Sequence, residues 1–241
     1  MKILVVNDDS IDSPGIAVLA KAAMALGEVT VVAPANQCSA MSQKISIHAA
    51  LKVEKVEDFP VPVKAAYKVD GTPADCVKVA LQYILEEKPD YVFSGINDGY
   101  NVGYDIAYSG TLGAAFEAVM NGIPAIAFSS TIHAPLDIAE DYLTPIAKEL
   151  VEAGLSRGEV WNVNFPAVER EALKGILRDR YIAPVQFYSE NYVEEKLPDG
   201  TVTLTGQGTP LSAEDAVPGG SDVQAVLHGY ISIGKVKSVV L

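Results

Sequence analysis

Residues 2–10 read KILVVNDDS, an apolar run that stops abruptly at four polar side chains. The run at 2–6 is continuous rather than alternating and rich in β-branched residues, which is typical of a strand buried on both faces of a parallel sheet. In open α/β sheets, ligands bind beyond the carboxyl ends of the strands. The position of Asp8 and Asp9 directly after this run therefore predicts an α/β sheet with a functional site at that end.

The first strand begins a repeated alternation of strand and helix patterns. Short apolar runs typical of buried strands recur at 29–33, 90–94, 125–129 and 160–165. Helical patterns lie between them, and three begin with a capping residue, namely Ser13, Thr72 and Ser109. A further helix is expected at 138–153, whereas 44–70 is interpreted as extended chain. We therefore expect a doubly wound, mainly parallel Rossmann-like sheet with right-handed crossovers.

After residue 180 the strand–helix alternation ends. Residues 181–206 contain two strand-like runs joined at Pro198-Asp199-Gly200, which predicts a β-hairpin excursion from the core. A short helix that ends near Gly229 and a final strand are expected within 222–234. The predicted organisation is an α/β metal- and phosphate-binding core at 1–180, an extended β-hairpin at 181–210 for oligomerisation, and a C-terminal return segment at 211–241.

Charge restricts the classes of partner. The 241 residues carry a formal net charge of −13, which argues against polymeric nucleic acid and anionic membranes as partners. A phosphate-bearing substrate would need a local cation, and a metal ion is the obvious candidate. No run of 18 apolar residues occurs and the chain enters a strand at once, so we expect neither a transmembrane helix nor a signal peptide. The two cysteines lack metal-ligand spacing, and a cytoplasmic protein is expected.

The adjacent carboxylates of Asp8 and Asp9 are the sharpest chemical feature. Two such groups repel each other unless a cation or a proton lies between them. A solvated turn is the common interpretation of an Asp-Asp pair, but its place directly after a buried strand favours a metal site. Carboxylate oxygens together with amide and hydroxyl oxygens suit Mg²⁺ or Mn²⁺.

Two further loops supply polar groups to the same predicted edge. Asn97 and Asn101 lie in a glycine-flanked loop after the strand at 90–94. They either contribute to the site or simply stabilise their own loop. Ser109-Gly110-Thr111 opens a helix, whose free N–H groups and positive dipole suit a phosphate, with Gly110 allowing close approach. A plain helix cap is the commoner interpretation, and one helix end can serve both purposes.

Taken in order, the motifs resemble the SurE (survival protein E) nucleotidases over nearly the whole chain. The matching motifs are Asn7-Asp8-Asp9, Ala33-Pro34 with Ser39, 71–77 (GTPADCV), 94–97 (SGIN) with Gly99 and Asn101, 108–111 (YSGT), 162–166 (NVNFP), and Asp222 with 229–232 (GYIS). An ordered set of this length is far more specific than any single motif.

The resemblance implies metal-dependent hydrolysis of nucleoside monophosphates, at the 5′ and often the 3′ position, with some activity on short polyphosphate. It implies one divalent ion per subunit, held by Asp8, Asp9, Ser39 and Asn97. It also implies a phosphate site lined by Asn101, Ser109, Gly110 and Thr111, with Asp8, Asp9 and Asn101 as the catalytic residues. Homodimers or homotetramers that exchange C-terminal elements are expected.

The chain departs from the family pattern at a few loop positions. Ser10 and Ala40 stand where the family usually has glycine, and Ala35 replaces a common aspartate. None of these changes removes an implied ligand. Two other functions stay open from the residues alone: a Mg²⁺-binding receiver-like phosphoacceptor, and a nucleotide-binding regulator without catalysis. Whether Asp8 acts as a base or a nucleophile is also open.

Overall fold

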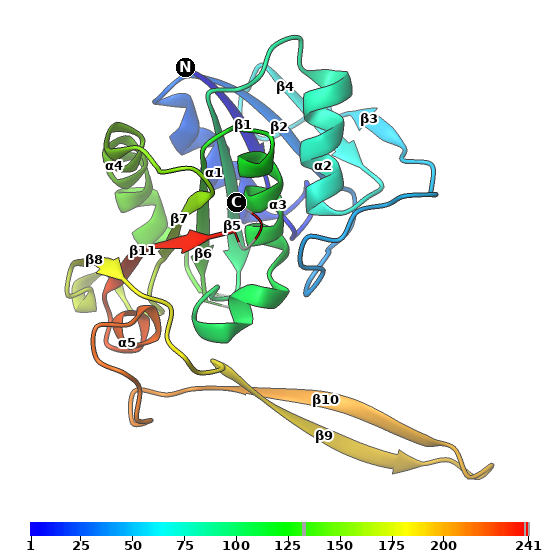
Figure 1. Cartoon of the computed structure of the whole chain (residues 1–241), viewed down its shortest axis with the longest axis vertical. Helices are drawn as coiled ribbons and strands as arrows, with labels where there is room; N and C mark the ends of the chain where they lie inside the picture. The colour runs from blue at the N-terminus through cyan, green and yellow to red at the C-terminus, as the bar shows by residue number, and fades with distance from the viewer. Residues whose placement is uncertain (132–133, 239, 241) are drawn as a thin grey trace.

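The computed structural model describes residues 1–131, 134–238 and 240. Within these residues the core is a nine-stranded sheet in the order β3-β4-β2-β1-β5-β6-β7-β11-β8 (Figure 1). The strands are β1 (Lys2–Val6), β2 (Glu28–Pro34), β3 (Val53–Lys55), β4 (Ala65–Val69), β5 (Tyr91–Asp98), β6 (Ala125–Ser130), β7 (Glu159–Asn164), β8 (Ile176–Arg180) and β11 (Ile231–Lys237).

The sheet is mainly parallel, as the sequence predicts. The pairs from β4 through β2, β1, β5 and β6 to β7 are all parallel. The exceptions lie toward the two edges, where β3 runs antiparallel to β4 and β11 antiparallel to β7. The carboxyl ends of the central strands therefore lie together at one end of the sheet, where the polar motifs of the sequence follow them.

Helices cover both faces of the sheet, which makes it doubly wound (Figure 1). On one face, α1 (Pro14–Met24) and α4 (Asp137–Ala153) bury Leu19 and Leu143 in the same apolar cluster. On the other face, α2 (Pro73–Val79) and α3 (Gly110–Met120) bury Val77 and Leu112. Short helical turns connect the rest, namely η1 (Ala80–Ile84), η2 (Gly103–Tyr108), η3 (Arg170–Ala172) and α5 (Asp222–Leu227). None of the described helices is both long and apolar enough to span a bilayer.

The capping residues found in the sequence begin their helices. The hydroxyls of Ser13, Thr72 and Ser109 each accept a backbone N–H in the first turn that follows. The α-helix that follows Thr72 is short, with only seven residues. Its α-helical part ends at Val79, and a wider turn follows in which Leu85 N donates to Ala80 O.

The predicted hairpin is a two-stranded antiparallel ribbon of β9 (Tyr188–Lys196) and β10 (Val202–Pro210), which projects from the body of the protein (Figure 1). The turn lies at Pro198-Asp199-Gly200, as predicted. Both strands lie further along the chain than 181–206 suggests, because Ala183 and Phe187 are buried on the body instead. Tyr188, the first residue of β9, packs edge-on against Phe187 at the root of the ribbon with ring centroids 4.9 Å apart.

Candidate functional site

The carboxylate of Asp8 is buried at the point where β1 ends and α3 begins. Its Oδ1 accepts a hydrogen bond from the Thr111 hydroxyl at 2.7 Å, and only 4% of the residue is exposed. A Cβ atom placed on Gly110 would lie 2.9 Å from Asp8 Oδ2. The sequence attributes the small size of Gly110 to an approaching anion, and in the structure the Asp8 carboxylate itself occupies that space.

The environment of Asp8 disfavours its charge. Burial, followed by the negative charge of Asp9, raises the pKa of Asp8 to about 7 against the opposing effect of the Thr111 hydroxyl. Burial also raises the pKa of Asp9, whose carboxylate accepts hydrogen bonds from Asp98 N at 2.8 Å and Gln37 Nε2 at 3.2 Å. A divalent cation between two such groups would remove this repulsion.

The donor set around the pair fits a hard ion. The part of the chain that the structure describes holds no group of three or more His, Cys, Asp and Glu side chains placed for a metal. Any ion held by Asp8 and Asp9 would therefore rely on hydroxyl, amide or water oxygens for its other ligands. Mg²⁺ is commonly bound in this way, through one or two carboxylates and several waters.

Ser39 lies in a loop, whereas Asn97 lies on β5, which extends to Asp98 instead of ending at 94 as the sequence suggests. Cys38 N donates to the backbone oxygen of Asp8 at 2.7 Å, which ties the loop that carries Ser39 to the end of β1. Ser39 is exposed. The amide nitrogen of Asn97 donates to Gly99 O at 2.7 Å, so its amide oxygen is the atom left to serve as a ligand.

The Asn101 side chain links β6 to the start of α3. Its amide nitrogen donates to Ser129 Oγ at 2.8 Å and to Thr111 Oγ1 at 3.2 Å, and Thr111 donates onward to Asp8. At the start of α3 the Ser109 hydroxyl accepts from Leu112 N at 3.0 Å, so Ser109 is an ordinary helix cap. The structure therefore brings Asp8, Asn101 and the start of α3 into one hydrogen-bonded cluster.

Three polar residues of this cluster are not among the predicted site residues. Ser129 lies on β6, one residue before its end, while Asn162 and Asn164 lie on β7 and contact the backbone of Asn101. A signal was present in the sequence: two asparagines alternate with apolar residues in a run that otherwise reads as a buried strand. Asparagine is depleted in strands, so such a pair indicates specific partners.

Two loop residues adopt the backbone that glycine favours. Ser10 has φ of 84° and Ala40 has φ of 55°. These are the two positions at which the family usually has glycine. The departures therefore keep the shape of the loops beside Asp9 and Ser39 at a cost in backbone energy.

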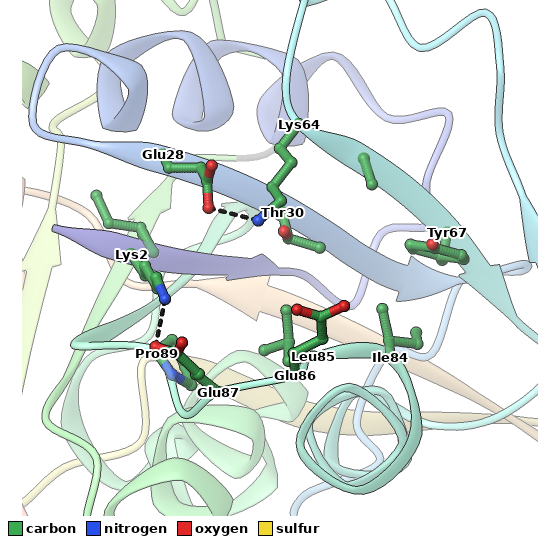
Figure 2. Close-up of a pocket in the computed structure, with 12 residues that line it drawn as sticks. Lys2, Glu28, Thr30, Lys64, Tyr67, Ile84, Leu85, Glu86, Glu87 and Pro89 are labelled. Atoms are coloured by element: carbon green, nitrogen blue, oxygen red, sulfur yellow. Dashed lines mark hydrogen bonds and ion pairs between the residues drawn. The ribbon is translucent and has the colours of Figure 1, made fainter.

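Two cavities lie at opposite ends of the sheet. A cavity of about 380 Å³ adjoins Asp9 and Asn97 and gives room for the organic part of a ligand. The other, of about 250 Å³, lies at the amino ends of β1 and β2 (Figure 2). Its lysines are neutralised there, since Lys2 pairs with Glu87 and Lys64 pairs with Glu28. Of these two cavities, the first is the one that adjoins the carboxylate pair.

Comparisons with known proteins identify the family and support the fold. The family model described as "Survival protein SurE" matches residues 3–183. The chain is 42% identical over 236 residues to "5′-nucleotidase SurE 1" of Thermus thermophilus, covering 97% of this chain and 90% of that protein. It is 39% identical over 237 residues to "5′-nucleotidase SurE" of Flavobacterium psychrophilum, covering 96% and 89%. A crystal structure of the SurE protein from Aquifex aeolicus superposes with a TM-score of 0.83 at 36% identity, covering 98% of this chain and 93% of that one.

Proposed function

The chain belongs to the survival protein SurE family, and on that premise we propose that it is a metal-dependent 5′-nucleotidase. It hydrolyses nucleoside 5′-monophosphates to a nucleoside and inorganic phosphate. We extend the proposal to nucleoside 3′-monophosphates and to short polyphosphate as further substrates. The observation that carries it is the buried Asp8 carboxylate, which lies beside Asp9 and against the start of α3.

One divalent ion per subunit, Mg²⁺ or Mn²⁺, completes the proposed site. Asp8, Asp9, Ser39 and Asn97 would hold it, and their oxygen donors suit either ion. When bound, such an ion supplies charge neutralisation for the phosphoryl group.

The chain's own residues orient the substrate. The first-turn N–H groups at Gly110 and Thr111, at the positive end of α3, stabilise phosphoryl charge beside Asp8. Asn101 adds its side-chain amide, which donates to Thr111 Oγ1. The cavity next to Asp9 and Asn97 accepts the nucleoside.

Phosphate release tests the proposal. The purified chain is assayed with nucleoside 5′- and 3′-monophosphates and with tripolyphosphate, after chelation and after addition of Mg²⁺ or Mn²⁺. We expect activity only with metal, and a fall of about 10²-fold or more in kcat for Asp9→Asn. Asp58→Asn, which changes an exposed carboxylate outside the cavity beside Asp9, is the matched control. Full activity after chelation would contradict metal dependence.

The same assay separates the two alternatives. A regulator without catalysis would bind nucleotide saturably and release no phosphate. A receiver-like phosphoacceptor would be labelled by acetyl phosphate, which a nucleotidase need not be. The family match over residues 3–183 favours the nucleotidase.

We also propose that the protein forms a homodimer or homotetramer and acts in the cytoplasm. The projecting β9–β10 ribbon supports assembly, because an isolated two-stranded hairpin is marginally stable in water and gains from a partner surface. The buried, unpaired state of Cys38 and Cys76 is compatible with a reducing compartment.

A further inference from the structure

The backbone of Asn101 is held by side chains rather than by a strand or a helix. Asn101 lies between Gly99 and Gly103, whose φ values of 149° and 56° take this segment out of regular structure. Only 5% of Asn101 is exposed. A buried N–H and C=O without a strand or helix partner must be paired in another way.

Two asparagines of β7 provide that pairing. Asn101 N donates to Asn164 Oδ1 at 2.9 Å, and Asn164 Nδ2 donates back to Asn101 O at 3.1 Å. Asn162 Nδ2 donates to the same oxygen at 2.8 Å. The Asn164 amide thus reproduces the two-point pairing of a neighbouring peptide group, and Asn162 adds a third hydrogen bond.

Apolar packing does not require these asparagines. Val163 and Phe165, which alternate with them, belong to the apolar core on the other face of the sheet. Among the described residues, Asn162 Oδ1 finds no hydrogen-bond partner although it is buried. An unpaired buried amide oxygen costs stability, so the presence of Asn162 indicates a use other than holding the fold together.

We propose that Asn162 and Asn164 are positioning residues for hydrolysis, which act through Asn101. The two amides fix the Asn101 backbone, the Asn101 side chain then donates to Thr111, and Thr111 donates to Asp8. Each member of this chain is at most 5% exposed, so solvent does not compete with its hydrogen bonds. This inference rests on the proposed nucleotidase function, because it assigns a role within that site.

Turnover of adenosine 5′-monophosphate by the metal-loaded protein is the first test. Asn164→Ala should lower kcat at saturating substrate by about 10- to 100-fold, since small displacements of reacting groups have effects of that order. Asn162→Ala should have a smaller effect in the same direction, because it removes one hydrogen bond and one unpaired oxygen. Ser232→Ala is the matched control: Ser232 lies opposite Asn164 on β11, is buried, and lacks a partner among the described residues.

A double-mutant cycle distinguishes positioning from a general structural role. In an Asn101→Ala background, adding Asn164→Ala should change kcat by less than about threefold, because the side chain it positions has gone. A merely structural Asn164 would instead change the melting temperature and the folded fraction, and its effect would multiply with that of Asn101→Ala. Equal losses in the two backgrounds, or parental kcat in a folded Asn164→Ala protein, would overturn the proposal.

Hydrogen exchange gives a readout that does not depend on activity. In metal-free protein, amide exchange of the peptide that covers 99–103 should be faster in Asn164→Ala than in the parent, and unchanged in Ser232→Ala. Unchanged exchange in Asn164→Ala would also overturn the proposal. If the parent releases no phosphate, the proposed function fails, while the exchange experiment still decides whether β7 holds Asn101.

Discussion

The Asp8 side chain is buried, lies beside a second carboxylate and contacts the start of α3. The pKa of Asp8 is about 7 in the folded protein against an ordinary 3.8, so the folded state holds this proton more tightly than the unfolded chain. The contribution of Asp8 to stability is therefore complete below the ordinary value and is lost as pH rises toward 7. Metal-free protein accordingly carries an electrostatic cost at neutral pH that a bound cation would remove.

Asp8→Asn should therefore stabilise the metal-free protein in a pH-dependent way. Asn keeps an oxygen that accepts from Thr111 and carries no charge. The gain in unfolding free energy over the parent should grow by roughly 1.4 kcal/mol per pH unit between about pH 4 and 7 and then stay constant. Urea unfolding after chelation at about pH 5 and about pH 8 measures it. A gain that is equal at the two pH values would contradict the assigned cause, and Asp12→Asn serves as the exposed control.

Gly110 offers a second test at the scale of one residue. It lies in helical backbone, so alanine there should not lower helix stability. Its added Cβ would nevertheless meet Asp8 Oδ2 at 2.9 Å and Asp8 Cβ at 3.0 Å. We expect Gly110→Ala to lower kcat about 10-fold and Gly110→Val further, with the melting temperature retained in the alanine variant. Parental kinetics in a folded Gly110→Val protein would show that the Asp8 contact is not needed for turnover.

At position 40, replacing the side chain with glycine should stabilise the protein. Its φ of 55° is a conformation that glycine adopts without a steric penalty. Ala40→Gly should raise the free energy of unfolding by up to about 1 kcal/mol, since the relieved strain exceeds the entropy that glycine adds to the unfolded chain. Thermal unfolding measures this. Ala35→Gly is the comparison, because residue 35 is outside the positive-φ set, and glycine there should not stabilise.

Individual residues differ in how well the sequence reveals them. Asp8 and Asp9 stand out because charged side chains directly follow an apolar strand. Asn162 and Asn164 are unusual residues in an apolar strand, but the sequence does not reveal their contact, because their partner Asn101 is about 60 residues away and only the sheet order brings β7 to it. The contact of Gly110 with Asp8 is visible only in the structure, since the sequence suggests that the space beside Gly110 holds an external anion.

At the scale of elements, a loop is held against the start of α3. Ser42 N donates to Tyr108 O at 2.9 Å and Ser42 Oγ donates to Ala107 O at 2.8 Å, which ties the Ser39 loop to η2. A Cβ placed on Gly113 would lie only 2.1 Å from Ser42 O. The absence of a side chain at Gly113 therefore lets the loop that carries Ser39 approach the helix closely.

Gly113→Ala should displace that loop. Because the clash is with backbone rather than with a flexible side chain, residues around Ser42 must move away from α3. We expect the metal concentration for half-maximal activity to rise about 10-fold. Ser42→Ala is the matched variant, which loses one exposed hydrogen bond and keeps the close packing, and it should shift the metal requirement little. An unchanged metal titration in Gly113→Ala would separate Ser39 from the metal site.

Elements with a continuous apolar run are predictable from the sequence, and edge elements are not. The central strands are predictable from the sequence because burial on both faces selects apolar residues along the whole run. β8 is not predictable in this way. Among the described strands it lies at the edge of the sheet beside β11, and it carries Arg178, Asp179 and Arg180, so no apolar pattern marks it. The antiparallel direction of β11 was also missed, since strand order and direction depend on tertiary packing rather than on local pattern.

At the scale of the whole molecule, the ribbon is rooted firmly in the body although it projects from it. Asp105 Oδ2 accepts from Phe187 N at 3.0 Å and Tyr188 N at 2.9 Å, and Phe187 packs edge-on against Tyr100. Tyr100 immediately precedes Asn101 in sequence. The root of the ribbon therefore lies beside the candidate site, and assembly through the ribbon would place a subunit contact near the loop that carries Asn101.

The two faces of the ribbon differ in polarity. In the antiparallel register Tyr192 lies opposite Gly206, so Tyr192 shares one face with Leu204 and Val202. The same face carries Glu194 opposite Leu204 and Lys196 opposite Val202, and these two charges pair with each other. Tyr192 is 62% exposed and Leu204 59% exposed. The other face carries Val193 among threonines, including Thr203 and Thr205. Large apolar side chains this exposed on a marginal two-stranded element favour contact with a second copy of the chain, and the paired Glu194 and Lys196 leave that face without net charge of their own.

Leu204→Asp should therefore weaken assembly while leaving the body folded. The charge would be desolvated in the proposed contact, whereas on a free ribbon it stays in water opposite Glu194, just as the control charge at position 203 stays opposite Glu195. Light scattering at micromolar concentration should show a dimer or tetramer for the parent and smaller particles for Leu204→Asp. Thr203→Asp introduces the same charge on the opposite face and should keep the parental size, because that face is not the proposed contact. A monomeric parent with full activity would contradict assembly altogether. Equal dissociation by both variants would show that the face with Tyr192 and Leu204 is not the one that joins the subunits.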